Sequence, residues 1–321
     1  MTIAKVADKG EALLSQVERV IVGKTEVLRL ILTGILAGGH ILLEDFPGLA
    51  KTLIARCFAQ ALGLSFKRIQ FTPDLLPTDI LGTYIFRQET GEFVLRRGPI
   101  FTQLILADEI NRATPKTQSA LLEAMQEFQV TLEGETLPLP QPFNVIATQN
   151  PIEYEGTFPL PEAQVDRFIM RLSIGYPTPG EEVNILQRRI DRKEDEVLLA
   201  AVTDTEKVLA MRAALEEVFV DPDILAYITS LVDETRHHKS LAVGASPRGS
   251  LALLKLSRAR AALAGRDFVI PDDIKEVAVP ALAHRLILSP DLWASKVRAQ
   301  DVVSELLYRL PVPKVAVPQV V

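Results

Sequence analysis

Cysteine is almost absent from this chain of 321 residues, which contains Cys57 alone. A single cysteine cannot form a disulfide within the chain, and this usage suits a reducing cytosol. Cys57 lies in a segment whose apolar residues recur at helical spacing, so we expect it to be a buried core thiol and not a nucleophile.

Long apolar runs are missing as well. The longest apolar stretch, residues 30–43, contains a threonine, a histidine and several glycines, and it is too interrupted to cross a bilayer. The first residues, 1–5, show no apolar signal-peptide region, and charged residues follow them. We therefore expect a soluble, cytoplasmic protein without a membrane partner.

An excess of positive charge is the third absence. The 35 basic and 41 acidic side chains give a formal net charge of −6, so no global field attracts nucleic acid or an anionic membrane. Lysine and arginine are also missing from residues 117–166, a segment that carries many carboxylates. These acidic residues are Glu123, Glu127, Glu133, Glu135, Glu153, Glu155, Glu162 and Asp166.

Apolar residues, in contrast, make up 48% of the chain, which at this length supports one large or two medium domains. Apolar runs of strand length alternate with helical patterns over residues 1–176, and this order is typical of an α/β fold with a parallel sheet. Pro177 and Pro179 mark a boundary, and the pattern beyond them is helical. We predict an α/β core over 1–176 and a smaller, all-helical lid domain over 177–321 with a proline-rich tail.

A loop between a predicted strand and a predicted helix is the first candidate site. The loop, residues 44–50, follows the apolar run at 41–43. The predicted helix after it begins at Lys51 and Thr52. Such a setting suits a phosphate-binding loop, because successive backbone N–H groups and the helix N-terminus can wrap phosphates. Lys51 would reach the β- and γ-phosphates, and the Thr52 hydroxyl would bind Mg²⁺. The residues expected to hold the nucleotide are Asp45, Phe46, Pro47, Gly48, Leu49, Ala50, Lys51 and Thr52.

The loop departs from the strict pattern G-x-x-x-x-G-K-[ST], which has glycine at the positions of Asp45 and Ala50. At position 50 the loop needs only to accept a small residue, alanine, in place of glycine. At position 45 an aspartate can support a turn through its own side-chain hydrogen bonds. The alternative interpretation is a strand–turn–helix corner whose lysine is solvated.

Two acidic residues, Asp108 and Glu109, end an apolar run that begins at residue 104. A buried parallel strand is expected to be such a run, and α/β folds place ligands at the C-terminal edge of the sheet. Asp108 could hold Mg²⁺, and Glu109 could orient and deprotonate an attacking water. The alternative is that both acids cap the next helix, but Thr114 and Pro115 fit those cap positions.

Three further positions carry weaker signals. Asn150 follows the apolar strand at 143–148, where its amide could position water near a γ-phosphate. The apolar segment at 20–22, ending in Val22, could pack an adenine ring, although ordinary core packing explains it equally well. Arg248 stands in the first turn of a helix, where the macrodipole disfavours a cation by roughly 0.3–1 kcal/mol, and a nucleotide phosphate would account for it.

Four short signatures, in order along the chain, resemble the MoxR family of AAA+ ATPases, which is itself similar to the ATPase subunit of magnesium chelatase. The resemblance covers nearly the whole chain. The signatures are QFTPD at 70–74, ADEINR at 107–112, ATQNP at 147–151, and LPEAQ with DRF at 160–164 and 166–168.

The resemblance implies a P-loop ATPase that uses ATP and Mg²⁺. It implies that hairpins near 83–97 and 129–139 are the helix-2 insert and the pre-sensor-1 hairpin, the latter facing the pore of a ring. Residue by residue, it implies Walker A at Lys51 and Thr52, Walker B at Asp108 and Glu109, sensor 1 at Asn150, an arginine finger aimed at a neighbour at Arg167, and sensor 2 at Arg248.

The resemblance also implies a biological task, namely chaperone-like remodelling, assembly or metal loading of a protein client. It implies a homo-oligomeric ring, which we expect to be hexameric, and a partner protein with a von Willebrand factor A domain. A magnesium-chelatase-type motor subunit shares these ATPase parts and differs in its partner.

Two rival functions belong to other classes. A nucleic-acid motor would need a basic pore hairpin, because counterion release supplies most of such affinity, and the segment 117–166 is acidic. The hairpin at 83–97 does carry Arg87, Arg96 and Arg97, which keeps this alternative open. A nucleotide-gated binding module that barely hydrolyses ATP is the other rival, and the presence of Glu109 argues against it.

Overall fold

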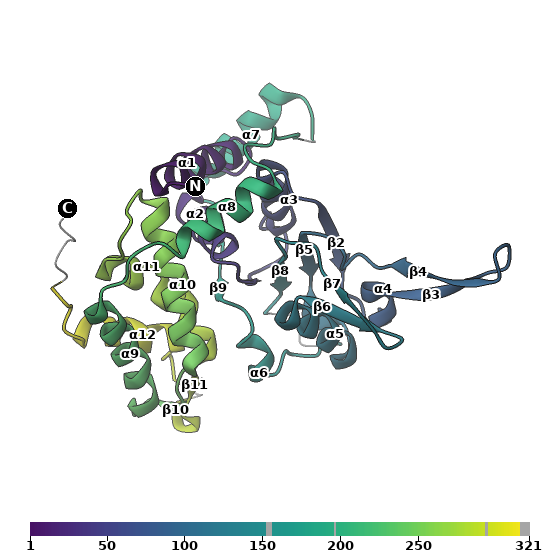
Figure 1. The fold of residues 1–321 in the computed structure, drawn as a ribbon. Helices are drawn as coiled ribbons and strands as arrows, with labels where there is room; N and C mark the ends of the chain where they lie inside the picture. The colour runs from purple at the N-terminus through teal and green to yellow at the C-terminus, as the bar shows by residue number, and fades with distance from the viewer. Residues whose placement is uncertain (152–155, 196, 293–294, 315–321) are drawn as a thin grey trace.

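The structure of the protein is a computed structural model that describes residues 1–151, 156–195, 197–292 and 295–314. A part built on a β-sheet and a part built from helices lie side by side (Figure 1). This arrangement confirms the predicted α/β fold followed by a helical lid. The portion of the proline-rich tail beyond Lys314 lies outside the described residues.

The central sheet has five strands in the order β2-β5-β8-β1-β9, and every neighbouring pair is parallel. The three inner strands β5, β8 and β1 are buried almost along their whole length, as their apolar sequences predict. Because all strands run the same way, their C-terminal ends meet at one edge of the sheet. The strands are β1 (Ile41–Glu44), β2 (Phe66–Gln70), β5 (Leu104–Asp108), β8 (Asn144–Gln149) and β9 (Met170–Leu172).

Helices cover the sheet and connect it to the lid. The two N-terminal helices α1 and α2 both pack against α10 of the lid, so one continuous apolar core includes residues of both parts. Gly63 ends α3 with a left-handed backbone at φ 67°, as expected of a glycine after a helix. The helices of this part are α1 (Ile3–Glu18), α2 (Thr25–Leu36), α3 (Lys51–Leu62), α4 (Pro77–Leu81), α5 (Pro115–Glu127) and α6 (Glu162–Val165).

The lid is built mainly of helices, several of which begin with a proline after a polar cap. Ser246 caps α10 by accepting a hydrogen bond from the backbone N–H of Arg248. A short antiparallel ribbon, which the sequence did not indicate, joins Leu241–Val243 (β10) to Ile287–Leu288 (β11). The helices are α7 (Pro179–Arg192), α8 (Thr205–Leu215), α9 (Pro222–His237), α10 (Pro247–Leu263), α11 (Pro271–Leu282) and α12 (Ala299–Arg309).

Two hairpins extend from the α/β part on the side away from the lid (Figure 1). The first pairs Gly82–Arg87 (β3) with Glu92–Arg97 (β4), and the second pairs Gln129–Leu132 (β6) with Glu135–Pro138 (β7). The Tyr84 hydroxyl donates a 2.6 Å hydrogen bond to Glu135, which links the two hairpins.

Two expectations about individual segments can be compared with the structure. Cys57 is buried in the core, and burial raises the pKa of its thiol to about 11, so it is an unreactive core residue. Among the helices of the described residues, none combines the length and the hydropathy that crossing a bilayer requires.

Candidate active site

The loop after β1 forms one wall of a pocket of about 400 Å³ at the C-terminal edge of the sheet. Gly48 has a φ of 83°, a left-handed conformation that favours glycine. Ala50 is also left-handed, at φ 57°, so this position needs more than a small residue, and alanine there is strained. The loop thus keeps the backbone shape of a glycine-rich loop at the position where the strict pattern has its second glycine.

The ammonium of Lys51 lies inside the curve of this loop. It donates hydrogen bonds to the backbone carbonyls of Asp45 and Phe46, the second at 2.9 Å. Burial lowers the pKa of Lys51, and the carboxylates of Asp45, Asp108 and Glu109 oppose this shift. A half-buried ammonium held by carbonyls is a site where an anion such as a phosphate would be stabilised.

Asp45 and Phe46, which were also expected to hold the nucleotide, do not line this pocket. The Asp45 carboxylate accepts hydrogen bonds from the backbone N–H groups of Ile174 and Gly175, at 2.6 and 2.8 Å, and from the Ser173 hydroxyl. Burial alone would raise the pKa of Asp45, but these hydrogen bonds lower it overall. Asp45 therefore anchors the loop to the segment after β9, and its contact with the nucleotide stays a prediction.

Asp108 stands opposite Lys51 with its two carboxylate oxygens in different surroundings. Oδ1 accepts a 2.7 Å hydrogen bond from the hydroxyl of Thr148 on β8. Oδ2 lies 3.5 Å from the Thr52 hydroxyl and faces the pocket. It also accepts a 2.9 Å hydrogen bond from Nε of Arg68 on β2.

The pair Thr52 and Asp108 fits the Mg²⁺ ion that the sequence predicts. Mg²⁺ binds oxygen ligands at about 2.0–2.1 Å and keeps several waters, so one hydroxyl and one carboxylate suffice beside substrate phosphates. The hydroxyl and Oδ2 are close enough to share one ion. These two residues would hold Mg²⁺ in the protein.

Glu109 has an unusual backbone, with φ 56° and ψ 51°. A residue other than glycine in this region costs roughly 1–3 kcal/mol, and such strain is concentrated at functional sites. The Glu109 N–H is fixed by a 2.8 Å hydrogen bond to the Thr148 hydroxyl, and its carboxylate accepts hydrogen bonds from Gln70 at 2.9 Å and Arg112 at 3.1 Å. The Glu109 side chain makes no capping hydrogen bond to a backbone N–H of the short helix that follows, so helix capping does not explain it.

Asn150 lines the same pocket, where the chain leaves β8. It is 6% exposed, so its position is set by packing. The structure therefore brings nine predicted residues together at this pocket, namely Pro47, Gly48, Leu49, Ala50, Lys51, Thr52, Asp108, Glu109 and Asn150.

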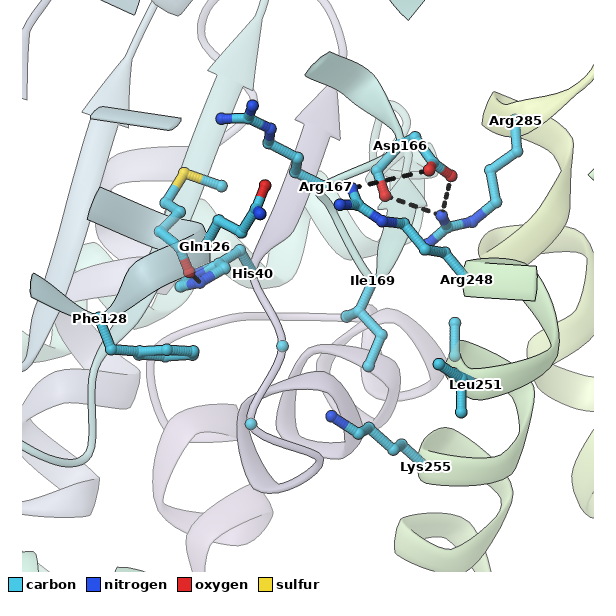
Figure 2. Close-up of a pocket in the computed structure, with 14 residues that line it drawn as sticks. His40, Gln126, Phe128, Asp166, Arg167, Ile169, Arg248, Leu251, Lys255 and Arg285 are labelled. Atoms are coloured by element: carbon cyan, nitrogen blue, oxygen red, sulfur yellow. Dashed lines mark hydrogen bonds and ion pairs between the residues drawn. The ribbon is translucent and has the colours of Figure 1, made fainter. Parts of the chain in front are cut away.

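Arg167 and Arg248 line a different pocket, of about 270 Å³, which shares no lining residue with the first. Figure 2 shows Arg248 and Arg285 converging on Asp166, while the Arg167 side chain points away from it. Arg285, only 3% exposed, binds the Asp166 carboxylate, and Arg248 lies 3.8 Å from it. In the part of the chain that the structure describes, the Arg167 guanidinium has no ion-pair or hydrogen-bond partner. The Asp166 carboxylate therefore pairs with Arg248 and Arg285 and not with the adjacent Arg167.

Residues 20–22, which were expected to contact the adenine ring, do not line the phosphate pocket. Ile21 is 5% exposed and belongs to the main apolar core, so ordinary packing accounts for it. Val22 is half-buried and does not line the phosphate pocket, and its role stays a prediction. Close by, Tyr176 stacks on Phe46 of the loop with ring centroids 5.9 Å apart.

Sequence reasoning missed two residues that contact the acidic pair, Arg68 and Thr148. Arg68 lies two positions before Gln70 on β2, so both side chains project from the same side of the strand. The sequence did contain one indication of Arg68, namely a basic residue on the same side of β2 as Gln70. It could have been paired with the two acids that end β5. Thr148 carried none, because a threonine in a strand is ordinary.

Comparison with known proteins agrees with this geometry. A family profile described as "ATPase family associated with various cellular activities (AAA)" matches residues 40–170, and an "AAA lid domain" profile matches residues 233–306. The chain is 47% identical to the uncharacterized protein YeaC of Bacillus subtilis over 94% of this chain and 93% of that protein. It is 44% identical to the chaperone MoxR1 of Mycobacterium tuberculosis over 96% of this chain and 84% of that protein.

A solved structure agrees as well. A crystal structure of a protein from Cytophaga hutchinsonii superposes with a TM-score of 0.91 at 40% identity, covering 97% of each chain. The fold, the loop and acid-pair geometry, and the full-length similarity to a MoxR chaperone lead to one assignment: the chain belongs to the MoxR family of AAA+ ATPases.

Proposed function

We propose that this protein hydrolyses ATP with Mg²⁺ in a homo-oligomeric ring and uses the energy to remodel, assemble or load metal into protein clients. The observation that carries the proposal is the gathering of Lys51, Thr52, Asp108, Glu109 and Asn150 around one pocket at the C-terminal edge of the sheet. A phosphate cradle, a metal ligand and a carboxylate base are the parts that phosphoryl transfer to water requires.

Each residue has a separate task in this proposal. Lys51 and the loop N–H groups hold the β- and γ-phosphates, while Thr52 and Asp108 hold the metal ion. A Mg²⁺ ion held by these two residues would supply positive charge that offsets the charge of the phosphates. Glu109 accepts the proton of the attacking water, and the Asn150 amide orients that water.

The position of Arg167 supports a site completed by a neighbouring subunit. Arg167 and Arg248 line a pocket separate from the phosphate pocket of the same chain. Arg248 therefore joins Arg167 as a candidate cation for the neighbour's nucleotide, rather than for the nucleotide of its own subunit. An arginine supplied in this way would stabilise charge that develops on the transferred phosphoryl group.

The biological task is proposed from the family. MoxR1 is named a chaperone, and the present chain aligns with most of its length. The same reasoning gives the proposed partner with a von Willebrand factor A domain, a ring of six subunits and a cytoplasmic location. The high identity to MoxR1 and the coverage of both chains favour this task over that of a magnesium-chelatase motor subunit.

Nucleotide binding is tested by Lys51→Ala. Removing the ammonium leaves the phosphates facing only backbone dipoles, so we expect a fluorescent ATP analogue to bind at least tenfold more weakly, roughly the value of a lost charge-assisted contact. Lys5→Ala, which removes an exposed lysine of α1, is the matched control and should bind like the wild type. If Lys51→Ala binds the analogue as tightly as the wild type, the phosphate-loop assignment is wrong.

The nucleic-acid motor is the second candidate, because Arg87, Arg96 and Arg97 are exposed on the β3–β4 hairpin. The other hairpin opposes it, since Glu133 and Glu135 are exposed there. Two acids of the same segment, Glu153 and Glu155, lie outside the described residues.

We expect no salt-sensitive binding to DNA or RNA, because the negative net charge and the acidic β6–β7 hairpin repel phosphates. Fluorescence anisotropy with single- and double-stranded oligonucleotides, at low and at physiological salt, measures this. Tight binding that weakens steeply with added salt would put the motor function first, and loss of that binding in Arg96→Glu would assign it to β3–β4.

A further inference from the structure

Arg68 of β2 occupies the metal-binding side of Asp108. Its Nε donates a 2.9 Å hydrogen bond to Asp108 Oδ2, and its terminal nitrogen lies 2.7 Å from the same oxygen. This oxygen is also the one that faces the Thr52 hydroxyl. The guanidinium and the predicted Mg²⁺ ion therefore compete for one atom.

The two partners differ in how firmly they are held. The Asp108 side chain is 10% exposed and is fixed through its other oxygen by Thr148, whereas the Arg68 side chain is 48% exposed. A divalent cation on Asp108 Oδ2 would repel a guanidinium at hydrogen-bond distance, since like charges this close disfavour each other strongly. On binding of Mg²⁺, the more exposed Arg68 would be the group that moves, because Asp108 is held through its other oxygen.

Arg68 has a new anion within reach when it leaves. It lines the same pocket as Lys51, Thr52 and Glu109, where the terminal phosphate of ATP would lie. A guanidinium presents its N–H groups in a planar fork that matches phosphate oxygens. Gln70, two residues further along β2, accepts a hydrogen bond from Arg68 and donates one to Glu109, so a move of Arg68 would also release Gln70 beside the acidic pair.

We propose that Arg68 is a nucleotide-sensing residue that pairs with Asp108 in the empty site and transfers to the γ-phosphate when Mg-ATP binds. This inference rests on the proposed function of the pocket. It adds a cation from the same subunit to the arginines proposed to come from the neighbour. It also gives the site a reason to prefer ATP over ADP, because ADP has no γ-phosphate to receive Arg68.

The experiment compares the affinities of Arg68→Ala and wild type for fluorescent ATP and ADP analogues in the presence of Mg²⁺. The preference for ATP over ADP is expected to fall by about 10- to 100-fold, the effect of one lost charge-assisted hydrogen bond. Arg68→Lys keeps the charge and should restore part of the preference. The matched control is Lys67→Ala, which removes an exposed cation from the opposite side of the same strand.

A second measurement titrates Mg²⁺ into the ADP-bound protein. Because Arg68→Ala removes the competitor for Asp108 Oδ2, half-saturation should need about two- to fivefold less Mg²⁺ than in the wild type, as expected for an ion pair this exposed. A merely destabilised protein would bind both ligands less well. A lower preference for ATP together with a higher affinity for Mg²⁺ would therefore show that Arg68 exchanges Asp108 for the γ-phosphate.

Two results would overturn the inference. An unchanged ATP-to-ADP preference in Arg68→Ala, in a wild type that binds both nucleotides, would show that Arg68 only neutralises Asp108. A wild type that binds neither nucleotide would remove the proposed function and this inference together. The first result leaves the ATPase function intact, so the two failures are distinguishable.

Discussion

Replacing Arg167 with alanine should leave ATP binding unchanged and abolish most turnover. An arginine finger is worth about 10³–10⁵ in rate in GTPase systems, because it stabilises charge on the transferred phosphoryl group. In this chain Arg167 lies outside the phosphate pocket, and among the described residues its guanidinium has no partner. Steady-state ATP hydrolysis, together with equilibrium binding of an ATP analogue, measures the two quantities separately.

The control for this variant is Arg309→Ala, which removes an arginine from an exposed ion pair with Glu305 on α12. Such pairs are worth roughly 0–1 kcal/mol, so this change should hardly affect turnover.

Wild-type activity per subunit should also fall when the protein is diluted below its assembly concentration. Near-normal turnover by Arg167→Ala alone would reject the assignment.

Mixing the Arg167→Ala and Lys51→Ala subunits tests whether the arginine acts on a neighbour. Each variant alone is expected to be inactive, but a mixed ring would contain sites with an intact phosphate loop facing an intact Arg167. Recovered activity would support action between subunits. A ring that hydrolyses cooperatively could be blocked by one inactive subunit, so the single variant remains the deciding measurement.

Glu109→Gln should separate binding from chemistry. The amide has nearly the same size as the carboxylate but cannot accept the proton of the attacking water, and a general base contributes about 10²–10⁴-fold to rate. We therefore expect Mg-ATP to bind with wild-type affinity and turnover to fall by about that factor. Single-turnover hydrolysis and nucleotide-binding assays measure the two effects.

Glu123→Gln, at an exposed position of α5, makes the same chemical change away from the pocket and should retain full activity. Turnover of Glu109→Gln within a factor of two of wild type would reject Glu109 as the base. That result would favour a nucleotide-gated binding module over an ATPase. With turnover blocked and ATP bound, the same variant can be used in pull-downs to identify the client protein.

The sequence by itself determined the fold class and most of the phosphate pocket. Apolar runs that each end in polar residues predicted parallel strands, and parallel strands must deliver those residues to one edge. For this reason the sequence alone groups Lys51, Asp108 and Asn150. Each of these signals is local to the end of one strand, and the parallel order of the strands brings the three strand ends together.

Tertiary structure alone decided the contacts between side chains that are far apart in sequence. Arg68 meets Asp108 only because β2 and β5 are neighbours in the sheet, and Asp45 accepts its hydrogen bonds from a segment more than a hundred residues later. The separation of Arg167 and Arg248 from the phosphate pocket depends on how α10 of the lid packs against the α/β part. A sequence pattern reports local periodicity and chain order, whereas these partners are set by long-range packing, which is why the structure was needed to find them.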